Sequence, residues 1–205
     1  MEALPAGFIY VSNFIDGLDE AIPYATNDNF LGQRVDGYLA SRAILTQQAA
    51  ESLAQVQRAA ITQGFRLKIF DAYRPARAVK HFLRWIDDVE SPECKQRFHP
   101  EFSKAELFEQ GYLATHSSHC RGSTVDLTLV SYQTGEELDM GTEFDFFGKE
   151  SWSSYQNLSL EQLSNRQLLQ DLMLANDFQP FELEWWHYML VNEPFPDTSF
   201  DFLVE

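Results

Sequence analysis

One stretch of the chain decides its fold: Ser117-Ser118-His119-Cys120-Arg121-Gly122-Ser123-Thr124-Val125-Asp126-Leu127-Thr128-Leu129-Val130. From Thr124 onward, apolar and polar residues alternate with period two, which predicts a β-strand. Gly122 can take backbone angles that other residues avoid, so a turn there could fold His119 back beside Asp126. The stretch therefore indicates two ligands for one metal ion at the start of a strand.

A catalytic zinc site needs a third protein ligand and leaves its fourth position to water. Among the five histidines, His187 has the most informative surroundings, because Glu184 lies three residues before it. A glutamate close to a zinc-bound water can accept the water's proton and later pass it to a leaving amine. The alternative is packed core, since a lone histidine in an aromatic, β-prone run more often packs than binds metal.

The two motifs together resemble the zinc-dependent D-alanyl-D-alanine dipeptidases of the VanX type, within the zinc D-Ala-D-Ala peptidases that share a fold with the hedgehog signalling domain. The family pattern Ser-x-His-x-x-Gly-x-(Ala or Thr)-x-Asp is met by Ser117, His119, Gly122, Thr124 and Asp126, and Glu-x-x-His is met by Glu184 and His187. Thr124 departs from the commoner alanine. Further matches are Asp71-Ala72-Tyr73-Arg74-Pro75, Asp139-Met140-Gly141-Thr142 and Phe144-Asp145.

The resemblance implies hydrolysis of the dipeptide D-Ala-D-Ala to free D-alanine. It implies one zinc ion per chain, with the ligands His119, Asp126 and His187. Glu184 is then the catalytic base, and Arg74 steadies the transition state. The positions that match the family's substrate-binding residues are Ser117, Asp145 and Tyr24.

Some of these residues have a plainer interpretation. Arg74 precedes Pro75, which favours an extended turn and presents the guanidinium from a fixed backbone. It could instead form only a salt bridge with Asp71. Asp145 could be a solvated loop acid in an acidic chain, and Tyr24 could belong to an ordinary loop.

The length and composition predict one α+β domain over residues 1–205, because 44% hydrophobic residues in a chain of this length can form a sizeable core. Strands starting near 65, 124 and 186 should pair, mainly antiparallel, in a central sheet flanked by helices. The periodicity predicts helices over 46–63, 76–89, 103–109 and 164–176, the last with Asn165 as its cap. In a regular strand Glu184 and His187 would face opposite sides, so we expect Glu184 in a bend before the strand. The strand order stays open.

The formal net charge of -16 argues against partners that carry phosphates, because such binding depends on Lys and Arg releasing counterions. We therefore expect neither nucleic acid nor an anionic membrane as a partner. The chain lacks the run of about 18 apolar residues that crosses a bilayer, and its start lacks the basic and apolar segments of a leader. These features predict a cytoplasmic protein, with Cys94 and Cys120 as free thiols.

Two other functions stay open. A zinc-stabilised binding module without peptidase activity would use the same scaffold, although the presence of both Glu184 and Arg74 argues against it. A peptidoglycan carboxypeptidase or endopeptidase would use the same zinc chemistry on longer substrates, but would normally need export. The sequence leaves open the oligomeric state, the breadth of dipeptides accepted, and whether the role is vancomycin resistance or recycling of cell-wall dipeptide.

Overall fold

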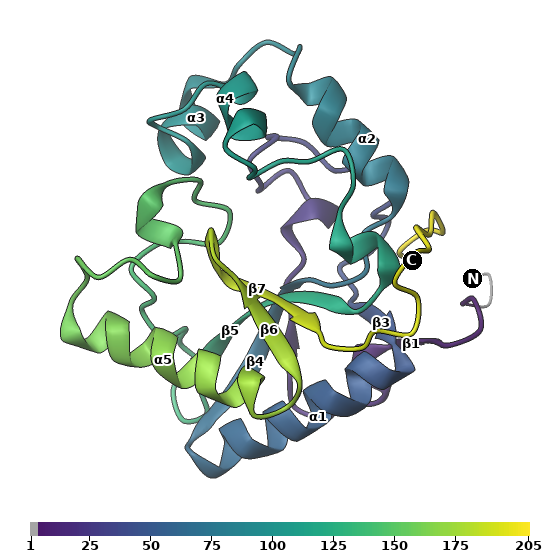
Figure 1. The fold of residues 1–205 in the computed structure, drawn as a ribbon, viewed down its shortest axis with the longest axis vertical. Helices are drawn as coiled ribbons and strands as arrows, with labels where there is room; N and C mark the ends of the chain where they lie inside the picture. The colour runs from purple at the N-terminus through teal and green to yellow at the C-terminus, as the bar shows by residue number, and fades with distance from the viewer. Residues whose placement is uncertain (1–3) are drawn as a thin grey trace.

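The computed structural model describes residues 4–205; residues 1–3, on which the expectation about a leader partly rests, lie outside the described part. The centre of the fold is a five-stranded sheet with the strand order β2-β4-β5-β7-β6 (Figure 1). These strands are β2 (Asp19–Glu20), β4 (Phe65–Asp71), β5 (Thr124–Ser131), β6 (Phe178–Phe181) and β7 (Glu184–Leu190). A separate two-stranded sheet pairs β1 (Phe8–Tyr10) with β3 (Ile44–Thr46).

The central sheet is mainly antiparallel, as predicted. β4 pairs antiparallel with β5, β5 with β7, and β7 with β6. Only the short edge strand β2 runs parallel to its neighbour β4 within the described residues. β4, β5 and β7 are the strands predicted near 65, 124 and 186, and they lie side by side in that order. The structure therefore supplies the strand order that the sequence left open.

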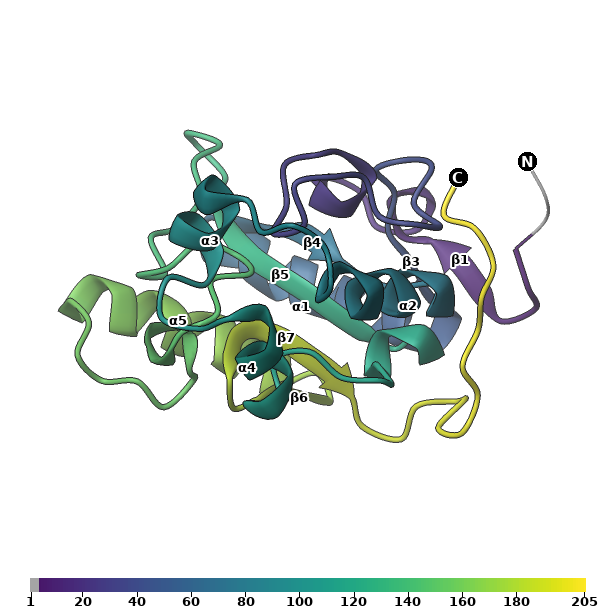
Figure 2. The same ribbon diagram turned by 90° about the horizontal axis from the view of Figure 1, so that it is seen from above.

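Helices lie on both sides of the strands. They are α1 (Gln47–Thr62), α2 (Ala76–Trp85), α3 (Pro92–Phe98), α4 (Lys104–Glu109) and α5 (Leu160–Leu174), with the short 3-10 helices η1 (Val11–Asn13), η2 (Pro23–Ala25), η3 (Ser118–Arg121) and η4 (Lys149–Ser151). In Figure 1, α1 and α5 lie below the strands, and α2, α3 and α4 lie above them. Figure 2 shows α2 and α4 in front of β5 and α1 behind it. The α+β class is confirmed.

The helix predicted over 164–176 begins earlier than expected. α5 starts at Leu160, because Ser159 accepts a hydrogen bond from the Gln162 amide and the Gln162 side chain accepts one from the Ser159 amide. This capping box satisfies two N–H groups that a helix start would otherwise leave free. Asn165, the expected cap, lies inside the helix, where its side chain donates to the Asp139 carbonyl.

The other predicted helices agree better with the structure. The hydroxyl of Thr46 caps α1, and Gly64, with a φ of 86°, follows its end. α4 matches the helix predicted over 103–109, whereas α2 ends at Trp85 and falls short of residue 89. No helix within residues 4–205 is both long enough and apolar enough to cross a bilayer.

Alternation along β5 separates the core from the candidate site. Val125, Leu127 and Leu129 are fully buried in the core, and burying each such side chain stabilises the fold by about 1.5–3 kcal/mol. Asp126 points to the other face, because successive side chains of a strand alternate. β4 pairs with β5 so that Asp71 lies opposite Asp126 at the end of β4. The sheet therefore brings two buried carboxylates to one place.

Candidate active site

His119 is placed by the short helix η3 and the turn that follows it. Ser117 caps this helix, its hydroxyl accepting a hydrogen bond from the His119 N–H at 3.3 Å. Gly122 ends the helix with a φ of 80°, which favours glycine, and a Cβ there would collide with the Phe8 ring. The turn brings His119 Nε2 within 3.2 Å of Asp126 Oδ2 on β5.

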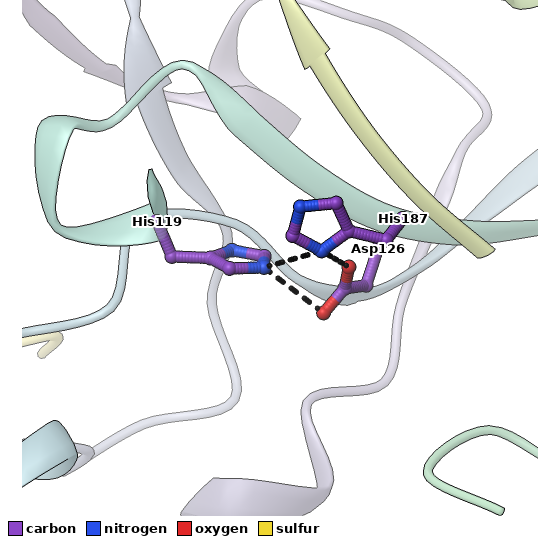
Figure 3. Close-up of side chains that lie close together, drawn as sticks. All are labelled: His119, Asp126 and His187. Carbon is purple, nitrogen blue, oxygen red and sulfur yellow. Dashed lines mark hydrogen bonds and ion pairs between the residues drawn. The ribbon is translucent and has the colours of Figure 1, made fainter. Parts of the chain in front are cut away.

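His187 approaches the same point from the neighbouring strand. Asp126 and His187 lie opposite each other across β5 and β7. His187 Nδ1 is 3.1 Å from Asp126 Oδ1 and 3.3 Å from His119 Nε2 (Figure 3). One potential ligand atom from each residue lies within 4.8 Å of the other two. The side chains selected as ligands thus converge from η3, β5 and β7.

Glu184 reaches this cluster because β7 is irregular at its start. Pro180 pairs with Tyr188, whereas the next residue, Phe181, pairs with Glu184, so the intervening residues of β7 bulge away from β6. The bulge allows Glu184 and His187 to approach each other, with Glu184 Oε2 3.5 Å from His187 Nδ1. The expected bend before the strand is wrong in one respect, since Glu184 is itself the first residue of β7.

Backbone and hydroxyl groups orient both imidazoles. His119 Nδ1 donates to the Ala72 carbonyl at 2.7 Å, which leaves a lone pair on Nε2, the nitrogen facing the cluster. His187 Nε2 lies 3.4 Å from the Ser118 hydroxyl. Neither Ala72 nor Ser118 was predicted to take part in the site. The available signals were that Ser118 directly precedes His119 and that Ala72 lies inside the matched segment Asp71–Pro75.

Arg74 projects toward the cluster from the turn after β4. Its Nε donates to Asp71 Oδ2 at 2.9 Å, and its Nη2 lies 3.6 Å from Asp126 Oδ2. The Tyr38 hydroxyl donates to the other oxygen of Asp71 at 2.7 Å. The salt bridge with Asp71 that the sequence left as an alternative is therefore present, yet Arg74 also lines the same cavity as His119. Asp71 and Tyr38 hold the guanidinium in place.

Burial and charge act against each other on the carboxylates of the cluster. Burial favours a raised pKa for Asp126, but the charges and hydrogen bonds of His119 and His187 outweigh it and hold the pKa well below its usual range. Burial raises the pKa of Glu184 to about 8, and the Asp126 carboxylate adds to this shift. Asp126 therefore stays ionised, the form in which a carboxylate can bind a metal ion, while Glu184 can exchange a proton near neutral pH.

Asp145 and Tyr24 form another wall of the site. The Tyr24 hydroxyl donates to Asp145 Oδ2 at 2.9 Å. Asp145 is only 5% exposed, which excludes the solvated loop acid that the sequence left open. Burial raises the pKa of Asp145 well above its usual range, and the Asp126 charge adds to the effect. A cationic partner would therefore stabilise the ionised form of Asp145.

A single cavity of about 390 Å³ joins these groups, a size suited to a small molecule. Its lining includes every residue selected from the sequence, namely Tyr24, Arg74, Ser117, His119, Asp126, Asp145, Glu184 and His187. His116 also lines the cavity, but it is exposed and does not belong to the ligand cluster. Arg121, which was not predicted to belong to the site, lines the cavity too.

Two imidazoles and a carboxylate beside a buried glutamate are the donor set and base typical of metal-dependent hydrolases. The comparison with protein families agrees with this class. The model of peptidase family M15, described as D-Ala-D-Ala dipeptidase, matches residues 5–205. The chain therefore belongs to this family of metallopeptidases.

Curated proteins named D-alanyl-D-alanine dipeptidase are similar to this chain over nearly its whole length. The one from Enterococcus faecium is 40% identical over 199 residues, which are 97% of this chain and 98% of that protein. The one from Enterococcus faecalis is 41% identical over 198 residues, 97% of this chain and 98% of that protein. The one from Streptomyces coelicolor is 42% identical over 197 residues, with coverages of 96% and 98%.

Proposed function

We propose that this chain hydrolyses D-Ala-D-Ala to free D-alanine, with one zinc ion held by His119, Asp126 and His187. The observation that carries the proposal is the convergence of these three side chains beside Glu184, inside a cavity of about 390 Å³. The relatives support the substrate, since they are named D-alanyl-D-alanine dipeptidases.

The residues of the cluster suit zinc. Asp126 Oδ1 is buried, and its near neighbour His187 Nδ1, at 3.1 Å, belongs to the same proposed ligand set, so a cation between the two residues would satisfy this oxygen. His119 keeps a lone pair on Nε2 because its Nδ1 donates to the backbone. Two imidazoles and one carboxylate are a ligand set that zinc accepts in catalytic sites. Zinc bound there would supply Lewis acidity, which would polarise the scissile carbonyl and lower the pKa of a water to about 7.

Glu184 and Arg74 carry out the proton transfer and the charge stabilisation. Glu184 accepts a proton from the attacking water as the new C–O bond forms, and it passes the proton to the amino nitrogen as the peptide C–N bond breaks. Arg74 donates to the oxygen that becomes negative in the tetrahedral intermediate. Its planar guanidinium offers two N–H groups in a fixed geometry, which a lysine ammonium cannot reproduce.

Asp145 and Tyr24 select the amino terminus of the dipeptide. Free D-Ala-D-Ala carries an ammonium beside the scissile bond, whereas a longer peptide has a neutral amide there. The buried carboxylate of Asp145 pairs with the ammonium but would be left unpaired beside the amide. Ser117 lines the same cavity and offers a further polar contact. Recognition of the ammonium therefore favours a free dipeptide over a peptidoglycan stem peptide.

The substrate assignment is tested by N-acetylation. Zinc-loaded wild-type protein should hydrolyse D-Ala-D-Ala and discriminate against its N-acetyl form by about three orders of magnitude in kcat/KM or more, because a site built around a polar partner rejects substrates without it. A chelator should abolish the reaction. Asp145→Asn keeps the side-chain shape without its charge and should narrow the discrimination by at least about tenfold.

Each contrary outcome of this experiment favours a named alternative. Equal rates on the two substrates in the wild type would favour a carboxypeptidase. Hydrolysis of neither substrate, with zinc retained, would favour a non-catalytic binding module. Unchanged discrimination in Asp145→Asn would remove Asp145 from the recognition of the ammonium.

Arg74→Lys should lower kcat by about a hundredfold or more while KM changes little, since the lost interaction forms in the transition state. The zinc content should stay at the wild-type level. Arg77→Lys is the matched control, because Arg77 lies on α2 and its side chain is 42% exposed and paired with Asp201. Near wild-type turnover in Arg74→Lys would assign the oxyanion to another donor.

The cellular location of the protein and the absence of nucleic-acid and membrane partners stay predictions from composition and charge. A cytoplasmic enzyme acting on a small dipeptide, without a nucleic-acid or membrane partner, fits the acidic chain. Vancomycin resistance and recycling of cell-wall dipeptide would both use this hydrolysis.

A further inference from the structure

The chain that follows β7 returns to the elements that carry the candidate active site. Residues 195–204, in the yellow end of the chain in Figure 1 and Figure 2, run past β1. Three of their side chains, Phe195, Phe200 and Phe202, surround the ring of Phe8 on β1, with centroid distances to that ring of 5.7, 4.8 and 5.0 Å. None of residues 195–204, all of which the structure describes, lines the candidate active-site cavity. The segment is therefore anchored by packing and stays outside the space in which a substrate would bind.

Phe200 joins the two backbone segments that carry Arg74 and His119. Its N–H donates to the Cys120 carbonyl at 2.9 Å, and its own carbonyl accepts from the Ala76 N–H at 3.0 Å. Cys120 follows His119 on η3. Ala76 lies two residues after Arg74. The Arg74 N–H also donates directly to the His119 carbonyl at 3.2 Å. Phe200 therefore supports the junction between the arginine and one of the proposed zinc ligands.

Tyr73 attaches Arg74 to segment 195–204 most directly. It immediately precedes Arg74 and is buried, but it does not line the cavity. Its hydroxyl donates to the Phe202 carbonyl at 3.1 Å and accepts from the Phe202 N–H at 2.8 Å. The two rings stack with their centroids 3.9 Å apart. Removing the hydroxyl would deprive both peptide groups of Phe202 of this partner, so the hydroxyl fixes the distance between the arginine and the segment.

Val204 supports the same arginine by a second route, through Tyr38. The Val204 N–H donates to the Gly37 carbonyl at 2.9 Å, and the Leu39 N–H donates to the Val204 carbonyl at 2.7 Å. These bonds hold the backbone on both sides of Tyr38, whose hydroxyl donates to Asp71 at 2.7 Å. Asp71 in turn accepts from the guanidinium at 2.9 Å. The backbone and the side chain of the arginine are thus both held from the same segment.

We propose that segment 195–204 positions Arg74 for the oxyanion, and that Tyr73 is the positioning residue that links them. The inference rests on the proposed function, in which Arg74 donates to the oxygen that becomes negative in the tetrahedral intermediate. A displacement of a catalytic group by about 1 Å can lower the rate by about a hundredfold. Residues that do not touch the substrate therefore set part of the turnover, because they hold the guanidinium at the distance that the transition state requires.

Tyr73→Phe tests the link, because it removes the hydroxyl and keeps the stacked ring. With zinc-loaded protein and D-Ala-D-Ala, kcat should fall by about tenfold while KM stays within about twofold, since the weakened interaction forms in the transition state. The zinc content should stay at the wild-type level. Arg77→Lys is the matched control. It alters a contact with Asp201 of the same segment, but both side chains are 42% exposed, so the pair contributes little and kcat should stay within about twofold.

A double-mutant cycle separates positioning from a general loss of structure. In the Arg74→Lys background, Tyr73→Phe should change kcat by less than about twofold, because the group that it positions is already lost. A merely structural role would lower kcat by the same factor in both backgrounds and would overturn the inference. Phe202→Leu removes the ring stack and leaves the peptide groups, so it should lower kcat with the same dependence on Arg74.

Hydrogen exchange provides a readout that does not depend on hydrolysis. The amides of residues 72–76 should exchange faster in Tyr73→Phe than in the wild type, and at the wild-type rate in Arg77→Lys. Unchanged exchange or unchanged kcat in Tyr73→Phe, or a loss of zinc that accompanies the loss of kcat, would overturn the positioning of Arg74 while leaving a dipeptidase intact. A wild type without activity on D-Ala-D-Ala would overturn the proposed function, and the exchange rates would still decide whether segment 195–204 holds the turn.

Discussion

Alanine at His119, Asp126 or His187 should remove the zinc ion and abolish measurable hydrolysis of D-Ala-D-Ala. Each substitution leaves only two of the three side chains proposed as zinc ligands, whose potential ligand atoms lie within 4.8 Å of one another. Loss of a residue that merely orients a ligand already weakens metal binding by about 10–100-fold, so loss of a ligand should cost more than about a hundredfold. The measurements are zinc per chain after dialysis against a weak chelator, and kcat/KM.

His116→Ala is the matched control for these variants. His116 lies three residues before His119 and lines the same cavity, but it is exposed and stands outside the ligand cluster. It should retain one zinc per chain. If the ligand variants also kept stoichiometric zinc at wild-type affinity, the ion would be bound elsewhere. Circular dichroism of each variant separates a lost ligand from a lost fold.

The part of the site that is local in sequence could be predicted from it. His119 and Asp126 are joined by a glycine turn and a strand with clear alternation, so their meeting depends on backbone rules that act over a few residues. The structure places His119 Nε2 3.2 Å from Asp126 Oδ2. The position of Arg74 could be predicted for the same reason, because β4 and Pro75 fix it within a few residues.

Contacts between distant segments could not be predicted in the same way. Tyr24 and Asp145 are 121 positions apart, and neither segment has a local pattern that specifies the other as a partner. Their roles came from the family resemblance, and only the folded chain shows the hydrogen bond between them.

Two errors have a local cause. The start of the helix was predicted at residue 164 from the apolar stripe of α5. However, Ser159 and Gln162 form a Ser-x-x-Gln capping box, a pattern that marks a helix start and is present in the sequence. The start of β7 was misplaced because strand alternation cannot represent a bulge. Glu184 and His187 approach each other only because the pairing of β7 with β6 is irregular there. The β-propensities of the extra residues in β7 do not indicate that irregularity.

Glu184→Gln should leave zinc bound and reduce kcat by at least about a hundredfold. Glutamine has the same shape as glutamate but cannot accept the proton of the attacking water, and general base catalysis contributes about 10²–10⁴-fold. Glu182→Gln is the matched control. Glu182 lies two residues away and is exposed, and among the described contacts its side chain accepts a hydrogen bond only from the Ser154 hydroxyl, so its variant should stay within a few-fold of the wild type.

The pH profile tests the same assignment independently. Burial raises the pKa of Glu184 to about 8, and a bound cation would lower it because an opposite charge favours the carboxylate. The base acts when deprotonated, so kcat/KM should rise with pH through this pKa, at a value below about 8, and then flatten. Glu184→Gln should lose this acidic limb, and Glu182→Gln should keep it. An unchanged limb in Glu184→Gln, or a rate within a few-fold of the wild type, would assign the proton transfer to another group.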